Sequence, residues 1–412
     1  MYTNGQWHDI IDTFMEYTEN VISPKIHRLW AAISMIGGAC ERRVWTQIGE
    51  NINFANLYVL LVAPPGTGKA VIDIVKDLWQ TTEEPGYANQ TAFRVASDSV
   101  TRASLVDEID KAKNIRILAG MNTGPYIYHT LLLAAEEFEV FMPGYDSGLI
   151  STLNKLWNNN PLYTETRRTG PVKSLSIQNP QLCLLGGAQP SYFVAHFPEE
   201  AWTTGLVRRT LMIYADAPPV RSLLAKTANK DYLKKRLLHE LSSVSSMYGE
   251  AKMSSLAAGY IDDWHQRGGP PAPDHPRLQF YKTTRSQFLI KLALISGVSR
   301  TGELTIDEID ADRAKGWLID AERVMPDIYR AMTGKSDALL LEELHMHMTS
   351  MYAANPNKAI EERFIYNFLK TWTVAERADK LISFAEKSGM IKRVPQTTNL
   401  WIPLVKDMRA EF

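Results

Sequence analysis

The spacing of apolar residues changes twice along this chain, at about residue 54 and at about residue 217. Before the first change, "WHDIIDTFMEYTENVI" and "IHRLWAAISMIGGA" place apolar residues at helical spacing, which predicts helices over residues 7 to 38. Between the two changes, the apolar residues form short runs separated by helical stretches and turn signals. These runs are "NLYVLLVA", "AFRV", "YIYHTLLLAA", "QLCLLGG" and "TLMIYAD". They predict the strands of a mostly parallel sheet covered by helices on both faces, which is an α/β fold.

Helical spacing returns after the second change. Helices are expected from about residue 230 to 265 and in the segments "SQFLIKLALISGVS" and "DADRAKGWLIDAERVMPDIYRAM". The stretch "QRGGPPAPDHPR", residues 266 to 277, is rich in Pro and Gly and predicts a connector or an exposed loop. A small helical domain that follows the sheet fits this pattern best.

The last segment has a pattern of its own. Helical spacing at residues 337–352, 362–371 and 374–388 precedes "SGMIKRVPQTTNLWIPL", which predicts two short strands around a Pro-Gln-Thr-Thr-Asn turn. Three helices followed by a β-hairpin are typical of the winged-helix variant of helix-turn-helix. The expected parts are an N-terminal helical region (1–50), an α/β core (51–217), a helical lid with connectors (218–335) and a winged-helix domain (336–412).

Length and composition fit a globular protein of about two or three domains. The 412 residues are 45% hydrophobic and 22% charged, and no apolar run approaches the roughly 20 residues that a membrane span requires. The N-terminus lacks the basic start and unbroken apolar stretch of a signal peptide. We therefore expect a cytoplasmic protein, in the host cytoplasm if a bacteriophage encodes it, with no membrane partner.

The positions of the cysteines and the net charge limit the kinds of site that this protein can contain. Cys40 and Cys183 lie far apart and lack metal-ligand spacing, so both are expected to be reduced and buried. The net charge of −1 argues against a surface coated with basic residues. Any contact with nucleic acid must then be concentrated in a local basic lining.

The segment "LLVAPPGTGKAVID", residues 60 to 73, carries the most constrained motif. An apolar strand, a loop of small residues and a helix let backbone N–H groups wrap a β-phosphate while a lysine neutralises the β- and γ-phosphates. A glycine turn without phosphate binding is the structural alternative. We call residues 63–70 the P-loop segment: Ala63, Pro64, Pro65, Gly66, Thr67, Gly68, Lys69 and Ala70.

The motif departs from its usual form at its last position. Ser or Thr normally follows the lysine and places a hydroxyl on Mg²⁺, whereas Ala70 has no side-chain oxygen. Mg²⁺ ordinarily keeps several waters, and a water can replace one hydroxyl. We therefore expect ATP binding to persist, with slower hydrolysis or an altered metal preference.

A nucleotide hydrolase also needs acidic side chains at the end of a neighbouring strand. The run "HTLLLAAEEFEVF" supplies Glu136 and Glu137, and Glu136, where an Asp is common, is expected to hold Mg²⁺. The Asp-Glu pairs in "SLVDEID" and "LTIDEID" lie in helical surroundings and are weaker candidates. The next strand ends in Gln189, which would orient the attacking water or simply form the turn before Pro190.

The order of these features resembles the AAA+ superfamily, and within it most of all the minichromosome-maintenance helicases and the related helicase-like ATPases of bacteriophages and prophages. "GLVRRTLMIYAD" is similar to the family's arginine-finger segment, with Arg209 at the finger position. "TTRSQFLIKLALISGVSRTGELTIDEIDADRAKGWL" is similar to the lid that contains the second sensor, which makes Arg285 the candidate there. An ordinary surface pair is the alternative for Arg208 and Arg209.

The resemblance also implies a contact with DNA. Alternating residues on either side of Thr169-Gly170-Pro171 predict a β-hairpin over residues 163 to 180. In the family such a hairpin projects into a central channel and carries a basic residue onto DNA. Lys173, Arg167 and Arg168 would then supply the local basic lining, and an exposed hairpin without this role is the alternative.

Two functions of different classes follow. The first is an ATP-driven DNA helicase that forms a homo-oligomeric ring, hexameric in the family it resembles, and translocates on single-stranded DNA during bacteriophage or prophage replication. The second is an ATP-binding helicase loader or replication initiator with little hydrolysis, which Ala70 favours and which Glu136, Glu137 and Arg209 disfavour. The first 50 residues are too few for a fused primase, so a primase or polymerase would be a separate partner.

Overall fold

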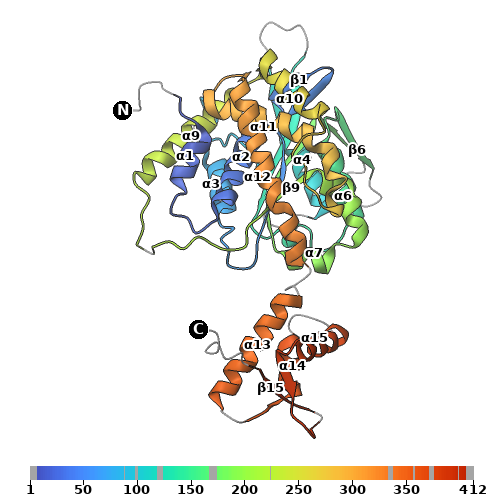
Figure 1. Ribbon diagram of the computed structural model, residues 1–412. Helices are drawn as coiled ribbons and strands as arrows, with labels where there is room; N and C mark the ends of the chain where they lie inside the picture. The colour runs from blue at the N-terminus through green and yellow to red at the C-terminus, as the bar shows by residue number, and fades with distance from the viewer. Residues whose placement is uncertain are drawn as a thin grey trace. The chain divides into compact units, whose positions relative to one another are not determined.

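A computed structural model describes residues 7–404 apart from residues 88, 98–100, 118–123, 167–173, 223, 333–336, 356–357, 371–374 and 398. The chain divides into two compact units, Met1–Ile328 and Tyr329–Phe412. The first unit includes the expected N-terminal helices, the α/β core and most of the expected lid region. Figure 1 labels the elements of both units.

The first unit is built on a five-stranded sheet with the strand order β4-β5-β8-β3-β9. β3 lies between β8 and β9 and is parallel to both, and β5 is parallel to β8. β4 is antiparallel to β5, so the sheet is mixed at this edge. The strands are β3 (Tyr58–Val62), β4 (Lys113–Arg116), β5 (Tyr126–Ala135), β8 (Pro180–Ala188) and β9 (Thr210–Tyr214).

Four of the five predicted strands are present as β3, β5, β8 and β9, whereas "AFRV" does not form a full strand. It contributes an isolated parallel bridge between Val95 and Leu132 of β5, with backbone hydrogen bonds from Ala96 N to Leu132 O and from Leu132 N to Arg94 O. β4 pairs with the first part of the same edge of β5, up to His129. Because β4 occupies that part, the "AFRV" segment pairs only with the part that follows.

Helices cover both faces of the sheet because its strands are apolar on both sides, and all five residues of β3 are buried. On one face the Cys183 thiol of β8 donates to Gly37 O of α2, and on the other the Tyr58 hydroxyl of β3 donates to Leu153 O of α6 (2.8 Å). Figure 1 shows α1, α2, α3 and α9 on one side of the sheet and α4 and α6 on the other. These helices are α1 (Ile10–Tyr17), α2 (Lys25–Cys40), α3 (Val71–Thr81), α4 (Arg102–Lys111), α6 (Ser147–Trp157) and α9 (Lys230–Ser246).

Smaller elements complete the first unit. The predicted hairpin is present in its two antiparallel strands, β6 (Leu162–Thr166) and β7 (Ser174–Gln178). Two further small sheets are β10-β1-β2 (Gly249–Glu250, Val44–Ile48, Asn51–Phe54) and β11-β12 (Lys252–Met253, Thr305–Ile306). The remaining α-helices are α5 (Phe138–Phe141), α7 (Pro190–His196), α8 (Gly205–Arg208), α10 (Ser255–Gln266), α11 (Arg285–Thr301) and α12 (Glu308–Met332), and 3₁₀ turns span Glu199–Thr203, Pro276–Leu278 and Tyr281–Thr284.

The helices of the expected lid region pack directly onto the N-terminal helices and the core. The Trp7 indole donates to Ser299 O of α11 (2.9 Å), and Asp9, which caps α1, forms an ion pair with Arg313 of α12. The buried Lys291 ammonium of α11 donates to Asn56 Oδ1 (2.6 Å), just before β3. Burial lowers the pKa of Lys291 to about 7. α11 and α12 therefore belong to the same packed unit as the sheet.

The second unit contains the three helices and the hairpin predicted for it. They are α13 (Asp337–Ala354), α14 (Glu362–Leu369), α15 (Ala375–Lys387), β14 (Ile391–Arg393) and β15 (Leu400–Pro403). A further short strand, β13 (Ile360–Glu361), makes a three-stranded sheet of order β13-β15-β14. Its hydrophobic core surrounds Trp401 and includes Leu344, Leu369 and Leu381.

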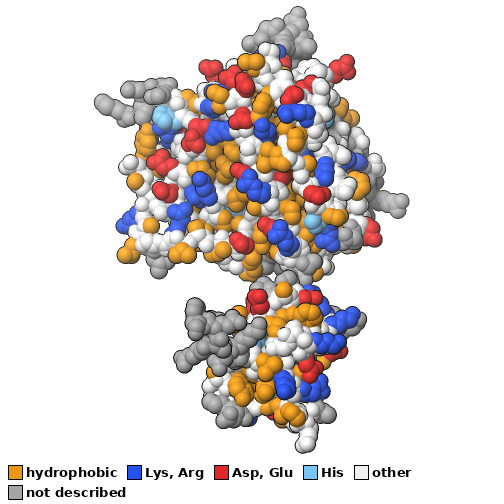
Figure 2. Space-filling model, in the orientation of Figure 1, with side chains coloured by type: hydrophobic (Ala, Val, Ile, Leu, Met, Phe, Trp, Pro, Cys, Tyr) orange, Lys and Arg blue, Asp and Glu red, His pale blue; other side chains and the backbone are white. Residues whose placement is uncertain are grey.

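Charged side chains of both signs are interspersed on the face shown in Figure 2, in keeping with the net charge of −1. Both cysteines are buried free thiols, as predicted. Among the described residues, no helix is both long enough and apolar enough to span a bilayer.

Candidate functional site

The P-loop segment joins the carboxyl end of β3 to the start of α3 at Val71. Gly66 and Gly68 have φ angles of 78° and 85°, which strain a residue that carries a Cβ. The Thr67 hydroxyl donates to Pro64 O (2.8 Å) and closes the loop on itself. Ala70 offers no side-chain cap to α3. A helix N-terminus of this kind directs backbone N–H groups toward an anion.

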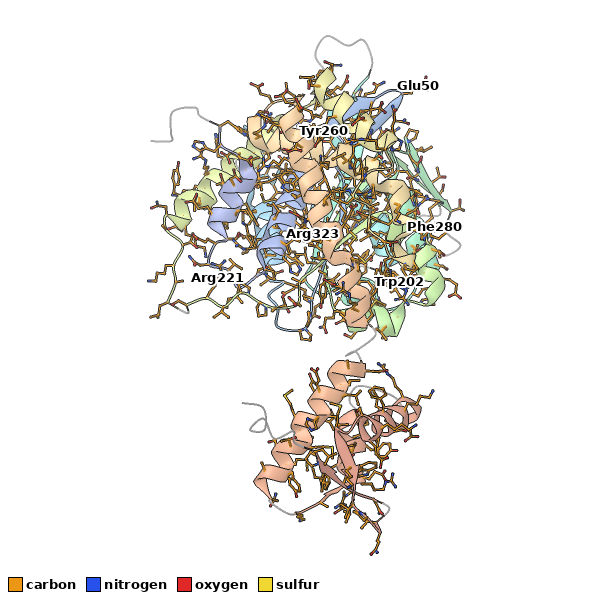
Figure 3. The ribbon with its side chains drawn as sticks, in the orientation of Figure 1. Glu50, Trp202, Arg221, Tyr260, Phe280 and Arg323 are labelled. Atoms are coloured by element: carbon orange, nitrogen blue, oxygen red, sulfur yellow. The ribbon has the colours of Figure 1, made fainter. Side chains whose placement is uncertain are left out.

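A loop between α1 and α2 forms one wall of this segment. A Cβ on Gly68 would collide with the backbone carbonyl of Ile22, while the Ile22 side chain itself is 52% exposed. Asn20 in the same loop donates to the Thr227 hydroxyl (3.4 Å), which ties the loop to the connector that follows β9, where Figure 3 labels Arg221. The sequence did not indicate this wall because the N-terminal residues carry no phosphate-binding motif.

Lys69 lies along the end of β8, where its ammonium donates to Ala188 O (3.4 Å). A Cβ on Gly187 would lie 3.0 Å from Lys69 Cδ and would collide with Glu136 O. The missing side chain at Gly187 thus lets the lysine and the acidic strand end approach each other across β8. Burial lowers the pKa of Lys69, and the neighbouring carboxylates, Glu136 foremost, oppose that shift.

Glu136 and Glu137 follow β5 directly, as the sequence predicts, and both are exposed. Glu137 precedes the short helix α5. Partial burial and the neighbouring Asp73 carboxyl of α3 raise the pKa of Glu136, whereas the charge on Lys69 lowers it. Asp73 is therefore a member of this acidic group that the motif did not identify.

A small depression brings together three of the predicted residues, Lys69, Glu137 and Gln189. Gln189 precedes α7, and its Oε1 accepts a hydrogen bond from the Ser191 hydroxyl (3.5 Å). The sequence did not indicate two further lining residues, Glu139 and Tyr192. The Tyr192 hydroxyl donates to Met142 O (2.6 Å), and burial raises the pKa of this phenol. The depression therefore places a cation, carboxylates and an amide around one small volume.

His27 of α2 lies behind the ends of β3 and β9 and is fully buried. Its Nε2 lies 3.1 Å from Ile213 O. Burial lowers the pKa of His27 to about 4, and the charge on Lys69 acts in the same direction. The imidazole is therefore neutral at pH 7, and Nε2 donates to the carbonyl.

The two arginines before β9 differ in their surroundings. The Arg209 guanidinium donates to Gly205 O (3.0 Å), Asn154 Oδ1 and Asn158 Oδ1 (both 3.4 Å), and so holds α8 against α6. Arg208 is partly exposed, and within the described part of the chain its side chain has neither a hydrogen bond nor an ion pair. Arg208 is thus the arginine of this pair that is free to contact another molecule.

Arg285 is not placed as the resemblance implied. Its side chain is 3% exposed and forms a two-point ion pair with Glu322 of α12, with Nε–Oε1 and Nη2–Oε2 distances of 2.6 Å. It also donates to Gly269 O (2.5 Å) and Pro271 O (2.7 Å). Because every guanidinium nitrogen is bonded within the protein, Arg285 fastens α11 to α12 and does not offer a donor to a nucleotide. This arrangement corrects the expected role of Arg285 as a second sensor.

The basic residues expected to contact DNA, Arg167, Arg168 and Lys173, lie outside the described residues. The base of their hairpin is described. His129 Nδ1 lies 2.8 Å from Gln178 O, and Asn179 Nδ2 donates to Ile127 O (2.8 Å). The hairpin is therefore anchored at the start of β5, the opposite end of that strand from Glu136.

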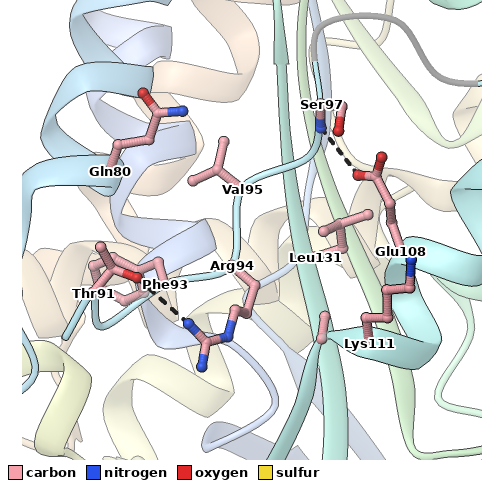
Figure 4. A pocket seen from close by; sticks show the side chains of 10 residues that line it. Gln80, Thr91, Phe93, Arg94, Val95, Ser97, Glu108, Lys111 and Leu131 are labelled. Atoms are coloured by element: carbon pink, nitrogen blue, oxygen red, sulfur yellow. Dashed lines mark hydrogen bonds between the residues drawn. The ribbon is translucent and has the colours of Figure 1, made fainter.

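A larger open pocket of about 650 Å³ lies elsewhere in the first unit, between the end of α3, the "AFRV" segment and α4. Figure 4 shows its charged side chains, Arg94, Glu108 and Lys111. Glu108 accepts a hydrogen bond from Ser97 N (3.0 Å). None of residues 63–70 lines this pocket. The size of a pocket therefore does not by itself identify the functional site. The P-loop segment is better suited to bind a phosphate, because it offers Lys69 and the backbone N–H groups of a helix N-terminus.

In the part of the chain that the structure describes, no group of three or more His, Cys, Asp or Glu side chains is arranged to hold a metal ion. Mg²⁺ is commonly bound by one or two carboxylates together with phosphate oxygens and waters, and Glu136 is the predicted residue whose carboxylate could serve as one such ligand. Comparisons with known protein families and with curated proteins find no match.

Proposed function

We propose that this chain is an AAA+ ATPase that binds ATP with Mg²⁺ and works as a ring-forming DNA helicase on single-stranded DNA during bacteriophage or prophage replication. The observation that carries the proposal is the meeting of Lys69, Glu137 and Gln189 around one depression. They follow three different parallel strands, β3, β5 and β8. The carboxyl ends of parallel strands form the edge where α/β proteins bind ligands.

The roles of the site residues follow from their chemistry. Lys69 neutralises the β- and γ-phosphates, and Glu137 accepts a proton from the attacking water that Gln189 orients. Glu136 holds Mg²⁺, which supplies charge neutralisation and orientation of the phosphates when it is bound. In this proposal α9 to α12 form the lid, the second unit is a winged helix, and Arg167, Arg168 and Lys173 contact DNA.

Two substitutions test the ATPase. Lys69→Ala is expected to abolish ATP binding, because the phosphates lose their cation. Glu137→Gln is expected to keep ATP binding while hydrolysis falls about 10² to 10⁴-fold, the range for loss of a general base. Binding of a fluorescent ATP analogue, phosphate release with and without single-stranded DNA, and unwinding of a forked duplex are the measurements.

Lys111→Ala is the matched control, because it removes a lysine from the larger pocket rather than from the P-loop segment. It is expected to leave binding and hydrolysis unchanged. Normal ATP binding and hydrolysis in both Lys69→Ala and Glu137→Gln would refute the site assignment.

Ala70 favours a second function, an ATP-binding loader or initiator whose nucleotide state controls assembly. The two functions differ in turnover: a motor hydrolyses ATP repeatedly in the presence of DNA, whereas a switch binds ATP and hydrolyses little. Ala70→Ser separates them. If the added hydroxyl turns a wholly inactive wild-type protein into an ATPase, the switch is the better description; if the wild type already turns over ATP, the motor is.

A further inference from the structure

The helix that follows Glu137 is too short to hold its own position. α5 spans four residues, Phe138–Phe141, and Glu137 is its N-cap, with no side-chain hydrogen bond to the helix. Helices shorter than about 12 residues are marginal in water unless other parts of the protein hold them. The position of the Glu137 carboxylate therefore depends on what α5 packs against.

Tyr192 of α7 makes two of these contacts. Its hydroxyl donates to Met142 O (2.6 Å), and Met142 is the C-cap of α5, where carbonyls have no partner within the helix. Its ring lies edge-on to that of Phe138, with centroids 5.9 Å apart. Tyr192 is 3% exposed. One buried side chain thus contacts both the first residue of α5 and the residue that ends it.

Tyr192 is also linked to the residue that would orient the attacking water. Its backbone N–H donates to Gln189 O (3.1 Å) in the first turn of α7, and Gln189 directly follows β8. Tyr192, Glu137 and Gln189 line the same depression. Tyr192 therefore connects the segment that carries Glu137 to the segment that carries Gln189.

The start of α5 has a second anchor on β8. A Cβ on Gly186 would lie 3.1 Å from Phe138 Cδ2, so the missing side chain lets Phe138 pack against the strand. This contact does not involve the Tyr192 hydroxyl. Removing the hydroxyl should then loosen the end of α5 at Met142 without unfolding the site.

We propose that Tyr192 is a positioning residue that fixes the Glu137 carboxylate relative to the Gln189 amide, so that both face the same attacking water. This inference rests on the proposed ATP hydrolysis. A base and a water-orienting group must both lie within hydrogen-bond reach of that water, and a displacement of about 1 Å can lower a rate about 10²-fold. The Tyr192 hydroxyl is bonded to Met142 O, so it acts through α5 rather than on the nucleotide.

The first experiment measures ATP turnover and binding of an ATP analogue by the full-length protein. Tyr192→Phe keeps the ring and removes the hydroxyl. It is expected to lower kcat about 10 to 100-fold and to leave the affinity for the analogue unchanged, because Lys69 and the P-loop segment are not moved. In a Glu137→Gln protein the same substitution should have little further effect, because the group that it displaces is already lost.

The second experiment does not depend on turnover. Hydrogen exchange, followed by mass spectrometry, reports the opening of α5 through the Val140 and Met142 amides, which donate to Glu137 O and Phe138 O. Tyr192→Phe is expected to speed exchange at these amides about 2 to 10-fold, the range for loss of one hydrogen bond. Exchange in the other strands and helices of the first unit should stay unchanged.

Tyr58→Phe is the matched control. Tyr58 is also buried, and its hydroxyl also donates to a backbone carbonyl, Leu153 O (2.8 Å), but it lies at the start of β3, the opposite end from the P-loop segment. It should lower the melting temperature about as much as Tyr192→Phe and keep the wild-type kcat and the wild-type exchange at α5.

Three results would overturn the inference and leave the ATP site intact: wild-type kcat in Tyr192→Phe, unchanged exchange at α5, or full multiplication of the two effects in the double variant with Glu137→Gln. Full multiplication would mean that Tyr192 acts independently of Glu137. A wild-type protein that binds no analogue or hydrolyses no ATP would instead refute the proposed function.

Discussion

The neutral state of His27 makes stability depend on pH. Its pKa is about 4 in the folded protein and about 6.5 in an unfolded chain. Because the unfolded state binds the proton more readily, the contribution to stability is complete above pH 6.5 and is lost as the pH falls toward 4. This difference between the folded and unfolded pKa of His27 corresponds to a loss of about 3 kcal/mol at most in the free energy of unfolding. We expect the free energy of unfolding to fall between pH 6.5 and 5, where most carboxylates remain ionised.

Denaturation by urea at several pH values, in wild type and in His27→Gln, checks this prediction. The glutamine can still donate to Ile213 O but does not titrate, so its stability should vary less over this range. His239→Gln, at an exposed position of α9, is the control and should follow the wild type. Parallel curves for wild type and His27→Gln would show that another group causes any acid sensitivity.

At the scale of elements, strong local patterns were predictable and pairings that depend on tertiary context were not. β3 and β8 were recognisable from their apolar runs. Such runs are expected where a strand is buried along its whole length, as both of these are. β4, with the sequence Lys-Asn-Ile-Arg, has no such run, and its pairing with β5 also decides how far "AFRV" can pair.

The same distinction applies to the candidate site. Lys69, Glu137 and Gln189 were predictable because the carboxyl ends of parallel strands meet at one edge, which fixes where the following residues lie. A long side chain on a helix is not fixed in this way. Arg285 turns inward because Glu322, 37 residues further along the chain, offers it a buried carboxylate, and no local pattern reveals that partner. Asp73 was overlooked because it lies after the P-loop segment and belongs to no motif.

The contrast between Arg208 and Arg209 makes a prediction about the end of α8. In the proposed ring, the free Arg208 rather than the tethered Arg209 reaches the ATP site of the neighbouring subunit. Arg208→Ala should keep ATP binding and lose hydrolysis by about 10³-fold or more, the range for such arginines. Arg209→Ala should chiefly lower the melting temperature, because its hydrogen bonds to Asn154 of α6 and to Asn158 at the end of that helix are lost.

Mixing subunits tests whether Arg208 acts between chains. Lys69→Ala subunits keep Arg208, and Arg208→Ala subunits keep Lys69, so a mixed ring contains some sites with both. We expect the mixture to regain part of the ATPase activity that each variant alone lacks. Full activity of Arg208→Ala alone would contradict the assignment, and no recovery on mixing would place Arg208 in its own subunit's site.

At the scale of the whole molecule, the two units have separate cores, and the proposed ATP site lies wholly within the first. The core around Trp401 is formed by residues after position 339, whereas the P-loop segment, the acidic strand end and Gln189 precede residue 190. A chain ending at Met332, the last residue of α12, should therefore fold and bind ATP. A ligand at 100 times its Kd stabilises a protein by about 2.7 kcal/mol, so the nucleotide should raise the melting temperature of the shortened chain as it does that of the full chain. Lys69→Ala in the shortened chain should remove the shift, and a chain that melts without a cooperative transition would show that the second unit is needed for the first to fold.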